Sequence, residues 1–258
     1  NCDWSSDVCS SDLESGEELG ARVVVTTLHP KRSFLELVER AALPEEFTRD
    51  IERWRTRSGT VKINLALSEL PDCRFAPGTR QQEHHAGSLV LSFSPGHLER
   101  AFQDANVRGV GSEQPFVEGT IPSSLDPQLA PEGVHVFSMF TQWVPHGWSE
   151  APHREELEAY ADRIVAIYDD LAPNFRRSVI ARQVLGPWDM EQELGMLGGN
   201  IFHGELSLDQ LFHMRPVAGY ADYRTPIRGL YHASSATHAG GGVNGIPGYQ
   251  AFRQATRD

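Results

Sequence analysis

Residues 230–245 read Leu-Tyr-His-Ala-Ser-Ser-Ala-Thr-His-Ala-Gly-Gly-Gly-Val-Asn-Gly, the most informative stretch of the chain. It belongs to a longer pattern: an apolar strand from Ile227 to Ala233, a glycine-dense loop, and a closing helix from about Ile246. Backbone N–H groups point out of a helix N-terminus, where the helix dipole adds partial positive charge. Because glycine has no Cβ, the main chain of such a loop can lie against a flat or phosphorylated ligand. The pattern predicts a contact with a nucleotide-type cofactor.

The spacing from Gly240 to Gly245 also satisfies G-x-G-x-x-G, the dinucleotide fingerprint. A full fingerprint opens a βαβ unit and is followed, about 20 residues later, by an acidic residue that binds ribose. The sequence given runs only to Asp258 and shows neither feature. Two interpretations stay open: a second contact to a cofactor whose main binding unit lies elsewhere, or a glycine-rich turn that binds no ligand.

The residues from Leu230 to Gly245 resemble the C-terminal flavin motif of the phytoene dehydrogenase-like (carotenoid desaturase-type) FAD oxidoreductases. That motif is an apolar strand and a small-residue turn, then Thr-His-Pro, Gly-Gly-Gly-Val and Gly. The resemblance extends from about Glu14 over nearly the whole chain, and it is carried also by Pro30–Val38, Val61–Pro71, Gly198–Glu205 and Ser207–Pro216. Two departures are visible: Ala239 replaces the usual proline, and Thr26-Thr-Leu-His-Pro30 stands where the family has Ser-Asn-Ala-Asp-Pro.

The resemblance implies an FAD-dependent dehydrogenase or desaturase that transfers hydride from an apolar or amphipathic small molecule to flavin. Members of the family begin with a βαβ unit that holds the ADP half of FAD, and the sequence given has no such unit. We therefore expect a truncated enzyme, inactive as it stands, with a partial Rossmann-like FAD/NAD(P)-binding domain. A non-catalytic binding or interaction protein on the same scaffold is the alternative.

The expected organisation has four parts. Residues 1–13 repeat Ser-Ser-Asp, contain Cys2 and Cys9, and are interpreted as a non-native leader rather than a metal or disulfide site. Residues 14–30 are the tail of the FAD-binding domain, residues 31–195 are the substrate domain, and residues 196–258 are the C-terminal part of the FAD-binding domain.

The expected fold class is α+β with a mainly antiparallel sheet. Alternation of Val61, Ile63, Leu65 and Leu67 with more polar residues predicts a half-buried strand over 60–68. Apolar residues at three- and four-residue steps predict a helix over 152–171. Further strands are predicted over 21–27, 88–93, 116–121, 134–144 and 176–185, and further helices over 33–42, 45–55, 97–106 and 188–193.

Two sets of polar or glycine residues are candidates for the site. The expected flavin contacts are Thr237, His238, Gly240, Gly241, Gly242, Val243, Asn244 and Gly245. The substrate-side candidates are His203, Glu205, Gln210 and Arg215. Other interpretations remain for some of them: His238 could bond its own turn, Arg215 could pair with Asp209 or Asp222, and His203 or His213 could carry a proton. No residue is selected as the catalytic acid or base.

Composition excludes several classes of function. A formal net charge of −12 argues against nucleic-acid binding, which needs a basic footprint. No apolar run approaches the roughly 18–20 residues of a membrane span. The histidines match no metal-site spacing, and no G-x-S-x-G elbow is present. Without a signal peptide, a cytoplasmic location is expected, or a mitochondrial one in a eukaryote. An amine-oxidase-like specificity would need an aromatic cage, to which Trp143, Trp148 and Tyr231 could contribute.

Overall fold

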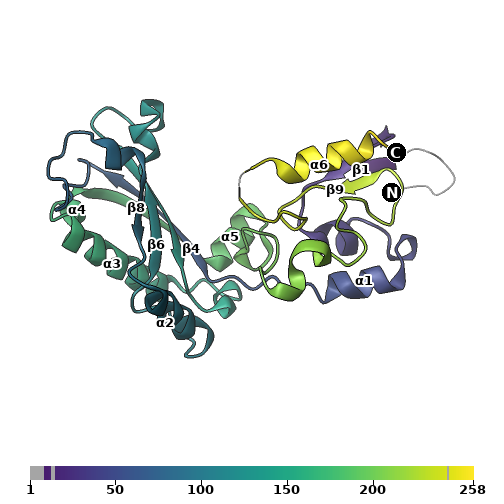
Figure 1. The fold of residues 1–258 in the computed structure, drawn as a ribbon, viewed down its shortest axis with the longest axis horizontal. Coiled ribbons are helices and arrows are strands. Elements are labelled where there is room, and N and C mark those ends of the chain that lie inside the picture. Colours follow the sequence, from purple (N-terminus) through teal and green to yellow (C-terminus); the bar gives the residue numbers. More distant parts are fainter. Residues whose placement is uncertain (1–8, 13–14, 243) are drawn as a thin grey trace. The chain divides into compact units, whose positions relative to one another are not determined.

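The computed structural model describes residues 9–12, 15–242 and 244–258. The chain divides into two units (Figure 1). The terminal unit comprises Asn1–Arg57 together with Asn200–Asp258, and the central unit comprises Ser58–Gly199. No helix in the described part of the chain is long and apolar enough to cross a membrane.

The central unit is built on a five-stranded antiparallel sheet with strand order β5-β6-β7-β4-β8. Its strands are β4 (Thr60–Leu67), β5 (Ser88–Leu91), β6 (Phe116–Thr120), β7 (His135–Gln142) and β8 (Val179–Leu185). Strands β4 and β7 pair without interruption from Thr60 opposite Gln142 to Leu67 opposite His135. The prediction of a mixed fold with an antiparallel sheet is confirmed.

One face of this sheet forms the core of the central unit. Val61, Ile63, Leu65 and Leu67 are buried there because successive side chains of a strand alternate between its two faces. The helices of the unit are α2 (Pro95–Asn106), α3 (Arg154–Leu171), α4 (Phe175–Ser178) and α5 (Pro187–Leu194). Figure 1 shows α3 and α4 along one face of the sheet, and α3 buries Tyr160, Ile164 and Tyr168 in the same core.

The other face of the sheet is partly open. Lys62, Asn64 and Ala66 of β4 and Ser138 and Phe140 of β7 are half-buried there. Single turns connect the elements of the unit: η3 (Glu83–Ala86), η4 (Pro122–Ser124), η5 (Pro127–Leu129), η6 (His146–Ser149) and η7 (Leu197–Gly199). The sequence extended β8 back to Arg176, but Phe175–Ser178 form a helical turn that buries Phe175 under the sheet.

The terminal unit joins chain segments that lie far apart in the sequence. Strand β3 (Val24–Thr26) pairs in parallel with β9 (Leu230–His232), and β1 (Cys9–Asp12) pairs antiparallel with β2 (Glu18–Ala21). The helices are α1 (Glu45–Glu52) and α6 (Ile246–Ala255). Shorter turns are η1 (Arg32–Glu36), η2 (Arg40–Ala42), η8 (Leu208–Gln210) and η9 (Phe212–Met214).

Residues 31–57 differ from the expected domain boundary. The sequence placed the region from residue 31 in the middle domain, but residues up to Arg57 belong to the terminal unit. The physical reason is a shared core: Phe34, Phe47 and Ile51 pack with Val217, Ile227 and Leu230. The predicted helix over 33–42 is instead a π turn followed by a 3-10 turn. Residues 1–8 and 13, most of the expected leader, lie outside the described residues.

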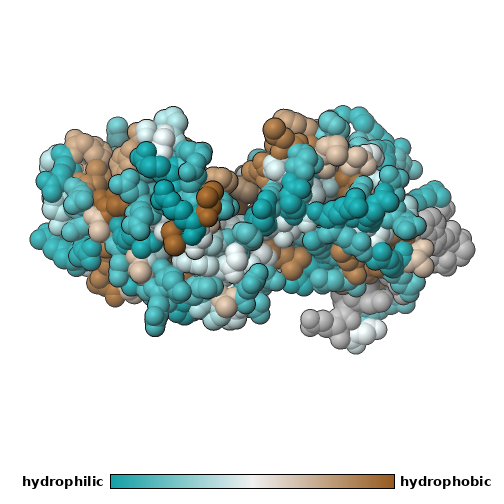
Figure 2. All heavy atoms as spheres, turned by 90° about the horizontal axis from the view of Figure 1, so that it is seen from below, coloured by the Kyte–Doolittle hydropathy of each residue, from teal (hydrophilic) through white to brown (hydrophobic). Residues whose placement is uncertain are grey.

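Apolar side chains are also found on the surface. Large exposed ones include Leu208 (88% exposed) and Val107 (76%). Figure 2 shows such side chains as separate brown patches among teal hydrophilic ones. Single exposed apolar residues are ordinary on folded proteins, so they do not by themselves mark a site.

Candidate functional site

The glycine loop leaves β9 through a tight turn. The Thr237 hydroxyl is buried and donates to the Ser234 carbonyl at 2.7 Å, and the Gly240 N–H donates to the Thr237 carbonyl at 2.7 Å. Gly240 and Gly242 have φ values of +86° and +100°. L side chains rarely adopt that region, so glycine is required for this path. Thr237 therefore stabilises the loop from its buried side, and its side chain is not exposed on the loop surface.

Helix α6 begins directly after the loop. Gly245 is its N-cap with φ 68°, and the Asn244 side-chain oxygen accepts from the Ile246 N–H at 2.9 Å. A Cβ built on Gly245 or Gly248 would meet no atom within 4 Å among the described residues. The main chain at the start of α6 is therefore open to close approach by another molecule. Val243, the remaining candidate of this group, lies outside the described residues.

Gly241 is in contact with a residue that the sequence did not select. A Cβ on Gly241 would overlap the ring of Phe202, so the ring lies directly on the Gly241 Cα. The chain's own packing thus demands glycine at this position, whatever ligand binds to the loop. His238 is exposed; its carbonyl accepts from the Tyr223 hydroxyl at 2.6 Å, and its ring lies 6.1 Å from the Phe212 ring.

Arg215 is a buried cation bonded to main-chain carbonyls. It is 1% exposed, and its Nε and Nη2 donate to the Ser235 carbonyl at 3.1 and 2.9 Å. The other acceptors of its guanidinium are the carbonyls of Phe202, Gly204, Glu205 and Gln210. The guanidinium also lies over the Trp54 ring at 5.1 Å. Burial lowers the pKa of Arg215 to about 10.

The ion pair considered for Arg215 is not formed. Asp209 instead binds Arg55, and Asp222 binds Arg224. Because five carbonyls surround the guanidinium, Arg215 connects the 202–210 segment to the turn that precedes the glycine loop. Its position favours a role in holding the loop over direct contact with a substrate.

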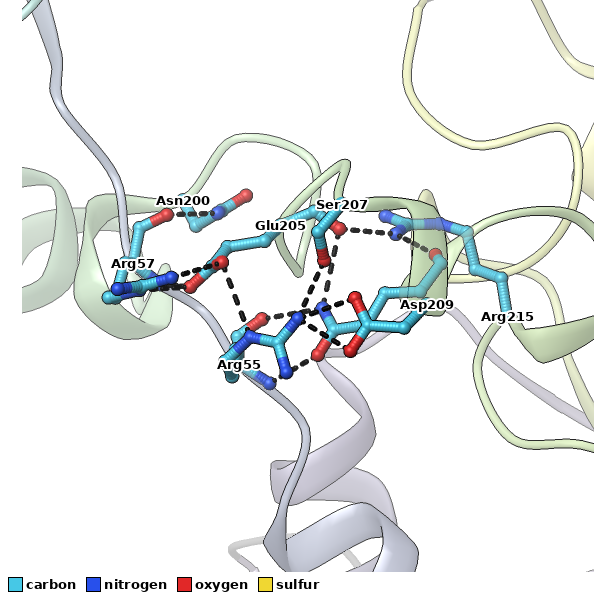
Figure 3. Close-up of polar contacts among 8 residues, drawn as sticks. Arg55, Arg57, Asn200, Glu205, Ser207, Asp209 and Arg215 are labelled. Carbon is cyan, nitrogen blue, oxygen red and sulfur yellow. Dashed lines mark hydrogen bonds and ion pairs between the residues drawn. The ribbon is translucent and has the colours of Figure 1, made fainter. Parts of the chain in front are cut away.

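Glu205 belongs to a neighbouring polar network with Arg55 and Arg57 (Figure 3), and the side chain of Gln210 also bonds Arg55. Glu205 pairs with Arg57 at 2.5 Å and with Arg55 at 3.4 Å. Burial alone would raise the pKa of Glu205, but the hydrogen bonds and charge of Arg57 outweigh it and lower the pKa. The Gln210 amide accepts from the Arg55 N–H at 2.8 Å and donates to the Arg55 carbonyl at 3.1 Å. These contacts bind residues 55–57 to the 205–210 segment.

His203 lies in a group of three histidines. Its ring centroid is 5.8 Å from that of His29, and both interact electrostatically with His232. Nε2 of His29 and the Nδ1 atoms of His203 and His232 are buried without a hydrogen-bond partner among the described residues. Burial, then the nearby cations and imidazoles, lowers the pKa of His29 to about 3. Burial lowers the pKa of His232 to about 4.

The sequence missed His29 and His232 as site residues. A signal for His29 was present, because it stands in the departure Thr26–Pro30 from the family pattern. No His, Cys, Asp and Glu group in the described ranges has the geometry of a metal site. Of the three aromatics considered as a cage, Trp143 and Trp148 belong to the central unit and Tyr231 to the terminal unit. Trp148 stacks on His153, and Tyr231 bonds Asp258.

Comparison with known proteins identifies relatives over nearly the whole chain. It is 43% identical over 256 residues to pyridine nucleotide-disulfide oxidoreductase domain-containing protein 2 of Rattus norvegicus, covering 95% of this chain and 43% of that protein. These two proteins are homologues. Prolycopene isomerase 2, chloroplastic, of an Oncidium hybrid cultivar is 30% identical over 90% of this chain and 36% of its own length. The phytoene desaturase (lycopene-forming) of a Paracoccus strain is 32% identical over 49% of this chain.

The homologues confirm the resemblance seen in the glycine loop. Among solved structures, an oxidoreductase from Methanosarcina mazei matches 94% of this chain and 44% of that chain, with a TM-score of 0.53 at 18% identity. Cyclohexylamine oxidase from Brevibacterium oxydans matches 93% of this chain with a TM-score of 0.50 at 12% identity. At these identities, the two structural matches show that the chain shares its fold with part of each protein. No family model matches the chain. The chain spans 43% of the length of the rat relative.

Proposed function

We propose that this chain supplies the flavin-ring contact and the substrate-facing sheet of an FAD-dependent oxidoreductase that oxidises an apolar or amphipathic small molecule. Homology to oxidoreductases over 95% of the chain supports the general activity. The observation that carries the cofactor assignment is the open main chain at Gly245 and Gly248, where the glycine loop runs into α6.

The residues at this place fit a large electron-rich group. Gly245 and Gly248 leave room for it, and the N-terminus of α6 offers partial positive charge where negative charge would develop on a reduced ring. The buried unpartnered nitrogens of His29, His203 and His232 fit a group that brings its own hydrogen-bonding atoms. When bound, FAD would supply the hydride acceptance that no side chain can perform.

The chain's own residues would then orient the cofactor. Asn244 fixes the first turn of α6, and Arg215 fixes the turn before the loop through the Ser235 carbonyl. His238, exposed beside the loop, is placed to contact a ligand there. In this proposal the terminal unit is part of a Rossmann-like FAD-binding domain, and the central unit is the substrate domain. The proposed location is cytoplasmic, or mitochondrial in a eukaryote.

Flavin retention tests the proposal. The purified chain is incubated with FAD, desalted, and examined for the flavin absorbance bands and for quenching of flavin fluorescence. We expect retained flavin in the wild type, loss of it in Gly248→Val, and retention in Gly147→Val. The two glycines are matched, since a Cβ on either meets no atom of the described residues within 4 Å and neither has a positive φ.

Absence of quenching at saturating FAD would contradict a flavin contact by this chain alone. Equal retention by Gly248→Val would contradict the assignment to the start of α6. The alternative function, a non-catalytic binding protein, would be favoured if a small molecule bound the chain while FAD did not.

A further inference from the structure

Lys62 lies on the partly open face of the central sheet. In the strand register it stands opposite Phe140 of β7 on one side and Leu185 of β8 on the other. Phe116 of β6 lies on the same face, with its ring 6.4 Å from that of Phe140 in an edge-to-face arrangement. The lysine is therefore a cation set among apolar side chains.

A chain of hydrogen bonds across three strands holds the ammonium in place. Lys62 Nζ donates to the Ser138 hydroxyl at 2.6 Å, and that hydroxyl donates to the Asn64 side-chain oxygen at 3.0 Å. The Asn64 amide in turn donates to Gln183 at 3.1 Å. Lys62 reaches Ser138 along the diagonal between neighbouring strands, a distance that a long side chain can span. The ammonium thus lies against β7, within hydrogen-bond distance of the Ser138 hydroxyl.

The ammonium has no acidic partner among the described residues. Burial lowers the pKa of Lys62, and no neighbouring carboxylate counteracts that effect. The acid on the same face is Glu118, which stands beyond Phe140 in the register and accepts from the Ser88 hydroxyl at 3.2 Å. An ammonium has three donors, and the bond to Ser138 uses one of them. A desolvated cation with spare donors is costly unless something satisfies it.

We propose that Lys62 binds the carboxylate of an amphipathic small molecule whose apolar body lies over Phe140, Phe116 and Leu185. The charge is complementary, and the flanking side chains suit an aliphatic or aromatic body. Identification of this ligand as the oxidised substrate rests on the proposed function. The binding itself does not, because it involves the central sheet alone and can be measured without flavin.

Calorimetry on the full chain without FAD tests the binding. The probes are decanoate, its methyl ester and decyl phosphate. We expect decanoate to bind at least about tenfold more tightly than the ester, because the ester removes a charge-assisted hydrogen bond. Lys62→Met should lower decanoate affinity by about tenfold, and Lys62→Arg should retain most of it. Decyl phosphate binding more tightly than decanoate would overturn the choice of carboxylate.

The sequence provides a matched control. Its only lysines are Lys31 and Lys62, so Lys31→Met removes the same charge elsewhere and should leave decanoate affinity unchanged. The same fact permits selective labelling: growth with 13C- and 15N-labelled lysine labels two side chains only and leaves the three N–H donors of each ammonium in place. Decanoate should shift the Lys62 signal and leave that of Lys31 in place.

Three further outcomes would overturn the proposal. They are equal affinity for acid and ester, unchanged affinity in a folded Lys62→Met variant, and a Lys62 signal that does not respond to decanoate. The labelled wild type decides the question even if Lys62→Met fails to fold. A negative result here leaves the flavin-retention test unaffected, so the two proposals can fail separately.

Discussion

Arg215 donates two hydrogen bonds from its guanidinium to one carbonyl, that of Ser235, at distances of 3.1 and 2.9 Å. The pair connects two segments of the terminal unit, the stretch around residues 202–215 and the turn that leads into the glycine loop. The path of the loop thus depends on a cation that does not lie on its surface.

Replacement of Arg215 by lysine should destabilise the protein by about 2–4 kcal/mol. A lysine has three donors and cannot reach all five carbonyl acceptors, so some of these carbonyls would lose their hydrogen-bond donor. Urea unfolding measures the loss. Arg253→Lys is the control, since Arg253 is exposed and lies over the Tyr249 ring at 5.8 Å. A loss below about 1 kcal/mol for Arg215→Lys would show that the carbonyls find other donors.

Gly241→Ala should destabilise the protein by about 1–3 kcal/mol, because the new methyl group overlaps the Phe202 ring. Thermal unfolding measures this. Gly248→Ala should be neutral or slightly stabilising, since in the described part of the chain no atom lies within 4 Å of its Cβ position. In the double variant Gly241→Ala, Phe202→Ala the two effects should not add, because removal of the ring creates room for the methyl group. If the two losses of stability add, the strain in Gly241→Ala does not come from contact with the Phe202 ring.

The ion pairs of Glu205 should make the free energy of unfolding depend on pH in the acidic range. Because the folded-state pKa of Glu205 is lowered, its contribution is present above the ordinary pKa of 4.5 and is lost as pH falls through the folded value. We expect about 1 kcal/mol at neutral pH, since Arg55 and Arg57 are half-exposed and water screens them. Glu205→Gln should flatten this part of the stability curve. If the free energy of unfolding of Glu205→Gln falls in parallel with that of the wild type below pH 4.5, the ion pairs of Glu205 contribute nothing to stability.

His29 and His232 should remain neutral well below the ordinary histidine pKa of 6.5. The unfolded chain then binds more protons, so stability falls as pH drops from 6.5 toward the folded values of about 3 and 4. The slope is about 1 kcal/mol per pH unit for each histidine.

Nitrogen-15 NMR can check both the charge and the tautomers. The His29 Nδ1 accepts from the Lys31 N–H and the His232 Nε2 faces the Leu28 carbonyl, so both rings should carry the proton on Nε2. An imidazolium signal from His29 at pH 6 would contradict burial as the cause.

Local pattern was enough to predict most elements of the central unit. The alternation along β4 and the three- and four-residue steps of α3 depend only on which faces of an element are buried, and both predictions hold. The same logic located the glycine loop and the start of α6 within a residue. Where local signals conflicted, as at Phe175–Ser178, the prediction was wrong: burial of Phe175 overrode the strand-like pattern.

The hydrogen-bond and ion-pair partners of individual side chains could not be predicted, because they depend on strand register and on segments distant in sequence. Arg55 meets Asp209 across 154 positions, and Lys62 meets Ser138 across 76. Asp209 and Asp222 were equally reasonable partners for Arg215, and the fold paired both with other arginines. His29 and His203 are likewise brought together by packing within the terminal unit.

Hydrophobic periodicity and turn chemistry are local, so the sequence was enough to predict most strands and helices of the central unit and the family that the glycine loop resembles. The fold was needed to show that Arg215 donates to carbonyls and not to a carboxylate, and that the Phe202 ring requires glycine at 241. It was also needed to show that no acid of the described residues pairs with Lys62. Each of these is a long-range contact, and side-chain partners are fixed by chain topology and strand register and not by neighbours in sequence.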